Sequence, residues 1–407
     1  MLAFLLVIIV ILETISAFSL GMIHTGKVRN LLRKTSLNMM DKPLTELCNI
    51  SKEACDAVTP MLAAFYSKIR YGAGDSDTAK LKSDATFFSI ADGIVQHMFI
   101  EYLFAGNKFG EIVGEEDGTA VNILEKPYSV DDLIVPAEFD NMIETTLEKV
   151  KALAARIDPK AYSDITVFVD PIDGTREFAT GKGDKVTILV GYNDPNGRPA
   201  AGIMYRPLTE PPTWAAGAAK EECIMGELDM AKGDEIKPKG LLITDGKVSP
   251  FIANVITELG WEQIPSLASG NRAMMLLEGK AGAYIRDTGG FAKWDTSGPQ
   301  AVIEAYGGTM SKLPPFLEDE SLESYTHLKA IDNLDFCDNS IVLTLSNSRA
   351  KEFAKERTNH IVRDAAMVKE YACLRGLVAL DKNNMEQLPV IRQAMLKVMK
   401  SHPPLFT

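Results

Sequence analysis

The sequence predicts a two-lobed α/β protein in which the two halves of the chain combine helices and strands differently. Three observations predict this class. Apolar residues recur at helical spacing early in the chain, a strand–turn–strand pattern follows at 185–208, and strands alternate with helices after Gly240. The 407 residues are 46% hydrophobic and 24% charged, which suffices for a large buried core.

Helical patterns open the first half of the chain. Apolar residues recur every three or four positions in 43–70 and again in 88–105, where we expect the helix to start near Asp92. A short strand at 110–114 then leads directly into Glu115. Residues 118–164 have the character of an insertion that contains one helix.

The stretch 165–178, ITVFVDPIDGTREF, places two carboxylates three residues apart at the end of a strand. An Asp-Pro turn would explain the turn-forming residues, but a turn does not need both acids. Because Pro171 fixes φ, Asp170 at the strand tip and Asp173 on the returning backbone can converge on one point. The carbonyl of Ile172 would face the same point, and these oxygen donors suit Mg²⁺.

Gly174 and Thr175 come next and are expected to begin a helix, whose unpaired N–H groups are a suitable seat for phosphate. Other acids also occupy loop positions. Glu115 follows a strand, Asp92 lies near one helix start and Asp295 lies at another. Acids at helix starts also stabilise the helix dipole, so Asp92 or Asp295 taken alone has a structural explanation.

The second half alternates strands with helices, which predicts a second α/β lobe. Its expected elements are a strand at 240–246, a helix at 250–261, a helix entering a strand at 271–285, and a helix at 295–308. The chain is therefore expected to divide into a leader at 1–40, an N-terminal lobe at 41–235, a C-terminal lobe at 236–345 and a helical C-terminal extension at 346–407.

Charge and cysteine content exclude some classes of function. The net charge of −12, without any run of Lys and Arg, argues against a nucleic-acid polymer as partner. The five cysteines are scattered, odd in number and without a CxxC pair, so we expect reduced thiols.

Residues 1–40 have the composition of a targeting leader. LAFLLVIIVIL at 2–12 is too short to span a bilayer and has the length of a signal-peptide core. The next segment is basic and has no acid between Phe18 and Asp41, as in a transit peptide. The combination resembles the bipartite leader of proteins sent to the secondary plastids of algae. The alternatives are the secretory pathway and a membrane anchor; without the leader we expect no stable membrane span.

Four motifs resemble one known family. GEED at 114–117, DPIDGT at 170–175 and WDTSGPQAVIEAYGG at 294–308 look like the signatures of the lithium-sensitive, Mg²⁺-dependent inositol monophosphatase superfamily. IADGIVQ at 90–96 is similar to its remaining acidic motif, and the resemblance covers residues 44 to about 345. It implies an α/β (α+β) fold, a layered αβαβα sandwich, and a cluster of two to three Mg²⁺ ions.

The resemblance also implies roles for individual residues. Metals would be held by Glu115, Asp170, the Ile172 carbonyl, Asp173 and Asp295. Asp92 would help to hold a further metal and the attacking water, which Thr175 and Glu115 would orient and deprotonate. The implied reaction is in-line attack of this metal-activated water on a small-molecule phosphate ester. A phospho-nucleotide sensor on an inactive scaffold would be favoured by a missing ligand, yet every acid position is filled.

DPIDGTREF and SGNRAMMLLEGKAGAYI, the latter at 269–285, look most like the 3'(2'),5'-bisphosphate nucleotidases. These enzymes remove the 3'-phosphate of adenosine 3',5'-bisphosphate, a reaction of sulfur metabolism. Arg272 falls where that subgroup has a basic residue facing the second phosphate, which a guanidinium can grip with two hydrogen bonds. The alternative for Arg272 is a solvated helix residue. Ser269 and Gly270 would offer a hydroxyl and a close backbone approach.

LLITDGKVS at 241–249 departs from the nucleotidase pattern, which tends to place Ser and His near the base. This chain offers Thr244, Lys247 and Ser249 there, and a lysine suits a second phosphate as well as a base. The alternative function is therefore that of an inositol polyphosphate 1-phosphatase or inositol monophosphatase, in phosphatidylinositol phosphate metabolism.

Overall fold

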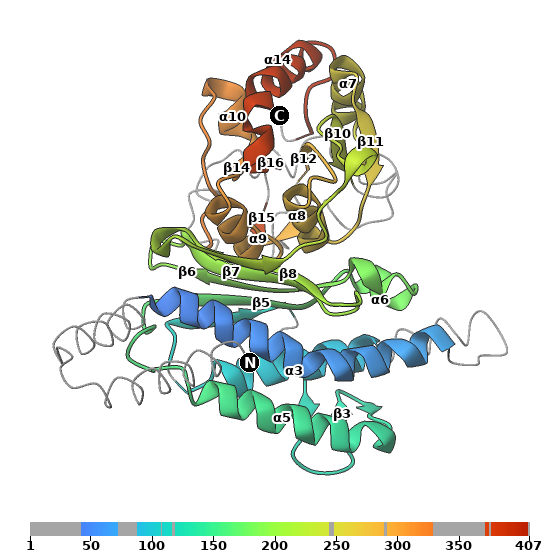
Figure 1. The fold of residues 1–407 in the computed structure, drawn as a ribbon, viewed down its shortest axis with the longest axis vertical. Coiled ribbons are helices and arrows are strands. Elements are labelled where there is room, and N and C mark those ends of the chain that lie inside the picture. Colours follow the sequence, from blue (N-terminus) through green and yellow to red (C-terminus); the bar gives the residue numbers. More distant parts are fainter. Residues whose placement is uncertain are drawn as a thin grey trace, which may run out of the picture. The chain divides into compact units, whose positions relative to one another are not determined.

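The computed structural model describes residues 42–71, 88–106, 108–115, 119–243, 248–288, 291–328, 371–373 and 376–405 (Figure 1). The predicted leader lies outside these residues. The described residues from Leu44 onward belong to one compact unit. Among the described helices, none is both long enough and apolar enough to cross a membrane.

A six-stranded sheet forms the first β-layer. Its strands lie in the order β1-β5-β6-β7-β8-β9, and β1 is parallel to β5 while the other neighbours are antiparallel. β6 and β7 form the predicted hairpin. The strands are β1 (Glu111–Gly114), β5 (Thr166–Asp173), β6 (Thr187–Asn193), β7 (Pro199–Arg206), β8 (Thr213–Ala218) and β9 (Cys223–Glu227).

Helices α3 (Pro43–Tyr71), 88–97 and α5 (Asp140–Ala154) share one apolar core with one face of this sheet. α3 starts with a proline, which fits the first turn because no intrahelical N–H bond is needed there. The thiol of Cys48 lies 3.6 Å from the carbonyl oxygen of Gly202 in β7. This helix therefore lies directly on the sheet.

The second predicted helix differs from expectation at its start. It is already helical at residue 88, so Asp92 lies inside the helix and not at its beginning. The helix then widens into a π-helical segment, η1 (Met98–Leu103). Apolar spacing locates a helix well but does not locate its first residue, because flanking apolar residues extend the same pattern.

A five-stranded sheet in the order β11-β10-β12-β16-β14 forms the second β-layer. β10, β11 and β12 are parallel, whereas β16 runs antiparallel to both of its neighbours. The strands are β10 (Gly240–Ile243), β11 (Glu262–Pro265), β12 (Ala283–Arg286), β14 (Thr309–Lys312) and β16 (Leu377–Leu380).

The C-terminal region differs from the helical extension that we expected at 346–407. Its described part supplies β16, which lies between β12 and β14 inside the second sheet. It also supplies the helix α14 (Leu388–Met399). A four-residue apolar strand among charged segments is a weak signal, and only its pairing partners reveal that it is central.

The predicted layered αβαβα sandwich is confirmed, and Figure 1 shows the helices and the two sheets in alternating layers. Neighbouring side chains along the strands belong to different apolar cores. In β10, Leu242 packs with α8 (Ser269–Leu277) and α9 (Trp294–Ala305), whereas Leu241 packs with α7 (Pro250–Leu259) and α14. Leu189 of β6 reaches the same α8/α9 layer from the first sheet. α8 and α9 are therefore sandwiched between the two sheets.

The remaining described elements are short. The insertion carries a small sheet, β2-β3-β4, besides α5. These elements are β2 (Val121–Asn122), β3 (Ser129–Val130), β4 (Leu133–Ile134), η2 (Ala137–Phe139), α6 (Thr175–Ala179), η3 (Gly183–Lys185), η4 (Ala219–Glu221), η5 (Gly233–Glu235), β13 (Phe291–Ala292), α10 (Leu313–Asp319), β15 (Ala372–Cys373) and η8 (Lys382–Gln387).

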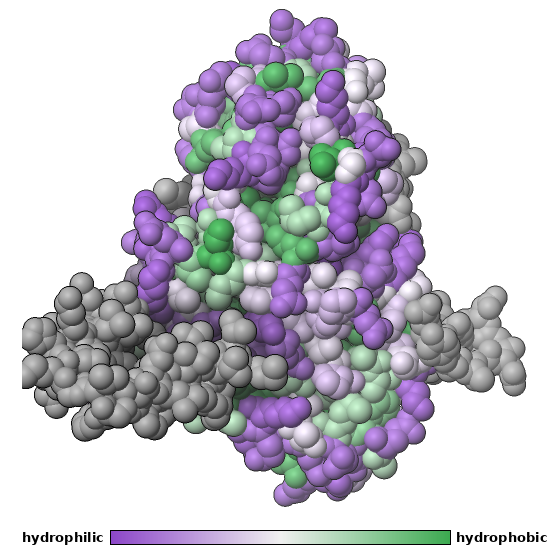
Figure 2. Space-filling view, viewed as in Figure 1, coloured by the Kyte–Doolittle hydropathy of each residue, from purple (hydrophilic) through white to green (hydrophobic). Residues whose placement is uncertain are grey.

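The surface is mostly polar and the described cysteines are unpaired, as the composition predicted. Polar residues cover most of the face shown in Figure 2, with smaller apolar areas between them. The four described cysteines are free and buried, as predicted, and Cys337 lies outside the described residues.

Candidate active site

β5 brings the two aspartates of DPIDGT to one place by a bulge. Pairing with β6 continues as far as Asp173, with a register shift between Asp170 and Asp173. Asp173 therefore lies farther along the same strand, and not on a returning backbone as we predicted. In a regular strand, side chains three residues apart point to opposite faces, so the irregularity is what allows both carboxylates to face one point.

Gly174 closes the strand and starts the predicted helix. Its φ of 102° is left-handed, a conformation that glycine adopts without strain. α6 begins at Thr175, as expected, and Thr175 is exposed to solvent. α6 has only five residues, so its dipole contributes less than a full-length helix would.

Asp295 enters from α9, in the first turn as predicted. The Oδ2 atom of Asp295 accepts a 2.6 Å hydrogen bond from the backbone N–H of Ala292. α9 approaches the first sheet closely, since a Cβ on Gly298 would lie 2.8 Å from the carbonyl oxygen of Val190. Only glycine permits this contact, which brings Asp295 down to the end of β5.

The structure brings three of the predicted ligands together. Asp170, Asp173 and Asp295 each offer a carboxylate oxygen, and these oxygens lie within 4.8 Å of one another. Burial raises the pKa of all three side chains above the ordinary aspartate value, that of Asp295 to about 6. Close negative charges add to this effect at Asp170 and Asp295. A bound cation would relieve both causes.

Asp170 provides the test of whether the site suits a metal ion. Its Oδ1 atom is buried and has no hydrogen-bond partner among the described residues. An ionised carboxylate in that position is costly unless a cation or a proton compensates it. Hard carboxylate oxygens, here from β5 and α9, are the donors that Mg²⁺ prefers, so these residues fit the ion that the motifs imply.

Asp173 has a different environment. Its carboxylate accepts hydrogen bonds from the hydroxyl of Thr187 at 2.6 Å, the backbone N–H of Ser269 at 3.0 Å and that of Gly270 at 2.6 Å. These donors, and the charge of Arg272, partly offset the rise in the pKa of Asp173 that burial causes. The sequence reasoning missed Thr187, although a hydroxyl in the otherwise mostly apolar strand TILVGYN was a usable signal.

Glu115 and Asp92 lie near enough to Asp170 for their charges to act on its carboxylate. β1 pairs in parallel with β5, with Gly114 opposite Val169, so Glu115 follows β1 where Asp170 follows Val169. The charges of both Glu115 and Asp92 contribute to raising the pKa of Asp170, after burial. Glu116 and Asp117 of the same motif lie outside the described residues.

Ile172 lies within the bulge, and its side chain is buried in the apolar core beneath the first sheet. Ser269 begins α8, and its hydroxyl donates a 2.9 Å hydrogen bond to the backbone oxygen of Asp295. Two of the predicted substrate residues, Thr244 and Lys247, lie outside the described residues.

The position of Arg272 excludes one of its two interpretations. It is 4% exposed, so it is not a solvated helix residue. Its guanidinium donates to the carbonyl oxygen of Ser266 at 2.9 Å and to the hydroxyl of Tyr284 at 2.7 Å, and it lies over the Tyr284 ring. A guanidinium held in this way has lost part of the hydrogen-bonding capacity that a phosphate would need.

Arg286, at the end of β12, is a second cation that the sequence reasoning missed. It is only partly buried, and its Nε donates a 3.1 Å hydrogen bond to the Thr288 hydroxyl. Its charge opposes the rise in the pKa of Asp295. Ligands of α/β proteins bind beyond the carboxyl ends of parallel strands, and Arg286 occupies such a position.

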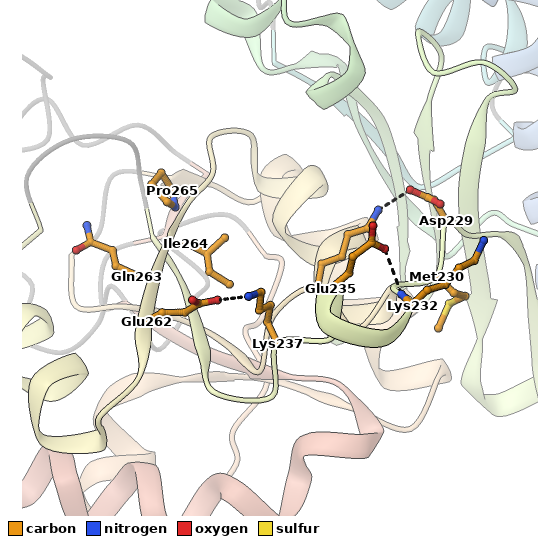
Figure 3. Close-up of a pocket in the computed structure, with 10 residues that line it drawn as sticks. Asp229, Met230, Lys232, Glu235, Lys237, Glu262, Gln263, Ile264 and Pro265 are labelled. Carbon is orange, nitrogen blue, oxygen red and sulfur yellow. Dashed lines mark hydrogen bonds and ion pairs between the residues drawn. The ribbon is translucent and has the colours of Figure 1, made fainter.

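A separate groove of about 670 Å³ runs along the edge strand β11 (Figure 3). Its lysines and acids are equal in number and partly paired, as in the 3.2 Å ion pair between Lys237 and Glu262. The groove therefore presents no net charge to a phosphate ester, and none of the three clustered aspartates lines it.

Comparison with known proteins agrees with the motifs. The family described as "Inositol monophosphatase family" matches residues 44–321. The chain is 29% identical to 3'(2'),5'-bisphosphate nucleotidase 1 of Mus musculus over 257 residues, 59% of this chain and 76% of the mouse protein. It is 27% identical to 3'(2'),5'-bisphosphate nucleotidase 1 of Dictyostelium discoideum over 251 residues, 58% of this chain and 74% of that protein.

Among solved structures, inositol monophosphatase-II from Staphylococcus aureus shares 10% sequence identity with a TM-score of 0.49, covering 87% of this chain and 98% of that one. The family match alone spans more than half of the chain. This protein therefore belongs to the inositol monophosphatase family and is a phosphoric monoester hydrolase.

Proposed function

We propose that this protein is a Mg²⁺-dependent phosphatase that removes the 3'-phosphate of adenosine 3',5'-bisphosphate. The observation that carries the metal dependence is the buried Oδ1 of Asp170, which has no hydrogen-bond partner in the described part of the chain and lies in a cluster of three aspartates. Two bisphosphate nucleotidases at 29% and 27% identity support the substrate.

Asp170, Asp173, Asp295 and Glu115 would hold the ion, with Asp92 beside them. Bound Mg²⁺ lowers the pKa of a nearby water and offsets charge on phosphoryl oxygens. This explains why the site gathers acids for an anionic substrate, since the cation reverses the local potential.

The protein's own groups perform the proton transfers and the orientation. In the proposed reaction the water oxygen forms a bond to phosphorus while the bond from phosphorus to the 3'-oxygen breaks. Glu115 accepts one proton of the water, Thr175 orients that water, and the 3'-oxygen takes up a proton from solvent as it leaves as a hydroxyl group. Thr175 is exposed at the start of α6, where a substrate can reach it.

The 5'-phosphate of the substrate needs its own cation. Arg272 is 4% exposed, whereas Arg286 lies at the carboxyl end of β12 and is more exposed, so we assign this role to Arg286. Arg286 is only partly buried and lies close enough to Asp295 to oppose the rise in its pKa. A planar guanidinium suits a terminal phosphate, which it can grip with two hydrogen bonds.

The test compares phosphate release from adenosine 3',5'-bisphosphate and from inositol 1,4-bisphosphate at equal concentration, with Mg²⁺ and with EDTA. We expect faster release from the nucleotide, AMP as product, and no release in EDTA or with Asp170→Asn. The exposed acid in Asp164→Asn serves as the matched control and should leave release unchanged. Faster phosphate release from the inositol ester would contradict the proposed nucleotide substrate. Phosphate release in EDTA would contradict the metal dependence.

A further inference from the structure

Thr187 is a buried hydroxyl whose hydrogen bond is directed at the acid cluster. Its relative exposure is 0%, and it starts β6, all seven residues of which are buried. Its Oγ1 donates to the Oδ2 atom of Asp173 at 2.6 Å. A hydroxyl in such a place destabilises the fold unless it forms a hydrogen bond, so its partner indicates its role.

The start of α8 holds the same carboxylate from a second direction. The backbone N–H of Ser269 donates to Oδ1 of Asp173 at 3.0 Å, and that of Gly270 donates to Oδ2 at 2.6 Å. Both oxygens are therefore engaged, Oδ2 by two donors. Hydrogen bonds to both oxygens fix the plane of a carboxylate as well as its position.

Gly270 shows that β6 and α8 fit around this hydroxyl. A Cβ at Gly270 would lie 2.4 Å from Oγ1 of Thr187 and 3.1 Å from Oδ2 of Asp173. Any larger residue would displace one of these atoms. The absence of a side chain at 270 thus supports the Thr187–Asp173 bond independently of the bond's own geometry.

We propose that Thr187 is a positioning residue that preorganises the site for a divalent cation. Together with the two amides of α8, it keeps an oxygen of Asp173 within 4.8 Å of oxygens of Asp170 and Asp295. The proposal rests on the proposed function only in requiring that the cluster binds a divalent cation. Residues that orient metal ligands typically change metal affinity by about 10- to 100-fold when they are replaced.

The test measures Mn²⁺ binding to the substrate-free, full-length protein by electron paramagnetic resonance. Thr187→Val removes the hydroxyl at nearly constant size, and Thr187→Ser is the matched control that keeps it. We expect the Val variant to bind Mn²⁺ about tenfold more weakly or worse. The Ser variant should stay within about twofold of the wild type, since it keeps the donor. Circular dichroism in EDTA establishes that both variants fold.

Gly270→Ala provides a second, independent change. It should weaken Mn²⁺ binding as well, and combining it with Thr187→Val should add little, because both act through one set of hydrogen bonds. If the Val variant does not fold, the Mn²⁺ affinities of Thr187→Ala and Gly270→Ala test the same proposal.

Equal Mn²⁺ affinity of the wild type and a folded variant without the hydroxyl overturns the proposal, as does a wild type that binds no Mn²⁺. Weaker binding by the Val variant and normal binding by the Ser variant support it, even if the wild type hydrolyses no phosphate ester. An inactive wild type would contradict the proposed function alone.

Discussion

A Cβ on Gly202 of β7 would lie 2.8 Å from the Cα of Gly298 in α9. The backbone of the helix therefore rests on the backbone of the sheet, with no side chain between them. Asp295 lies one turn before Gly298 in the same helix. This glycine contact fixes how far the carboxylate of Asp295 reaches toward Asp170.

Gly202→Ala should therefore damage both stability and metal binding. The added methyl group must push α9 outward, which we expect to cost about 1–3 kcal/mol of unfolding free energy. Urea unfolding and Mn²⁺ binding measure the two effects. Ile224→Ala, an exposed position at 56% on the same sheet, is the control and should change neither by much. Unchanged metal affinity in a destabilised Gly202→Ala protein would contradict this account of Asp295.

Asp170→Asn should stabilise the metal-free protein while abolishing its response to Mg²⁺. The neutral amide avoids the burial and like-charge repulsion that raise the pKa of Asp170. We expect a higher melting temperature in EDTA than for the wild type, and no further rise with Mg²⁺. Differential scanning calorimetry measures both, with Asp164→Asn as control. A variant that melts below the wild type in EDTA would show that Asp170 has a structural role.

The metal-free protein should lose stability as the pH rises from about 4 to about 6. Burial raises the pKa of Asp295, and separately that of Asp287, from 3.8 to about 6. Each binds its proton more tightly when folded, so its stabilisation is present at low pH and is lost as the pH passes through the folded pKa. The loss is roughly 3 kcal/mol at most for each group.

Urea midpoints in EDTA at pH 4.5 and pH 7 measure this effect. Other acids, such as Asp229 beside Lys280, have a lowered pKa and act in the opposite direction. The relevant quantity is therefore the difference between the wild type and Asp295→Asn. We expect the stability of the variant to fall less between the two pH values. An identical pH dependence would mean that Asp295 is not protonated preferentially in the folded state.

Leu380→Ala should strongly destabilise the protein, although it lies in the C-terminal region. Leu380 is fully buried in β16 and packs with α7 and α14. Replacing a buried leucine with alanine costs about 2–5 kcal/mol. Val390→Ala, 53% exposed on α14, is the control and should stay within about 0.5 kcal/mol. Equal urea midpoints for the two variants would show that the C-terminal strand is dispensable.

The sequence predicted individual helices and strands better than it predicted the contacts between residues far apart in the chain. The hairpin of β6 and β7, the helix that carries Asp295 and the start of α6 at Thr175 all agree with residue patterns. Thr187 and Arg286 escaped notice because one hydroxyl or one guanidinium has no meaning until its partner is known. The burial of Arg272 was not predicted either, because it depends on Tyr284 twelve residues away.

By itself, the sequence determined the kinds of atoms available for the site and the segments that carry them. Periodicity and turn chemistry depend on residues that are close in sequence, so the sequence alone was enough to predict these segments. Only the tertiary structure decided that a bulge turns Asp173 toward Asp170, that glycines let α9 descend onto the first sheet, and that β16 lies inside the second sheet. Each depends on contact between residues far apart in the chain, and the energy of such contacts is set by packing that no local pattern encodes.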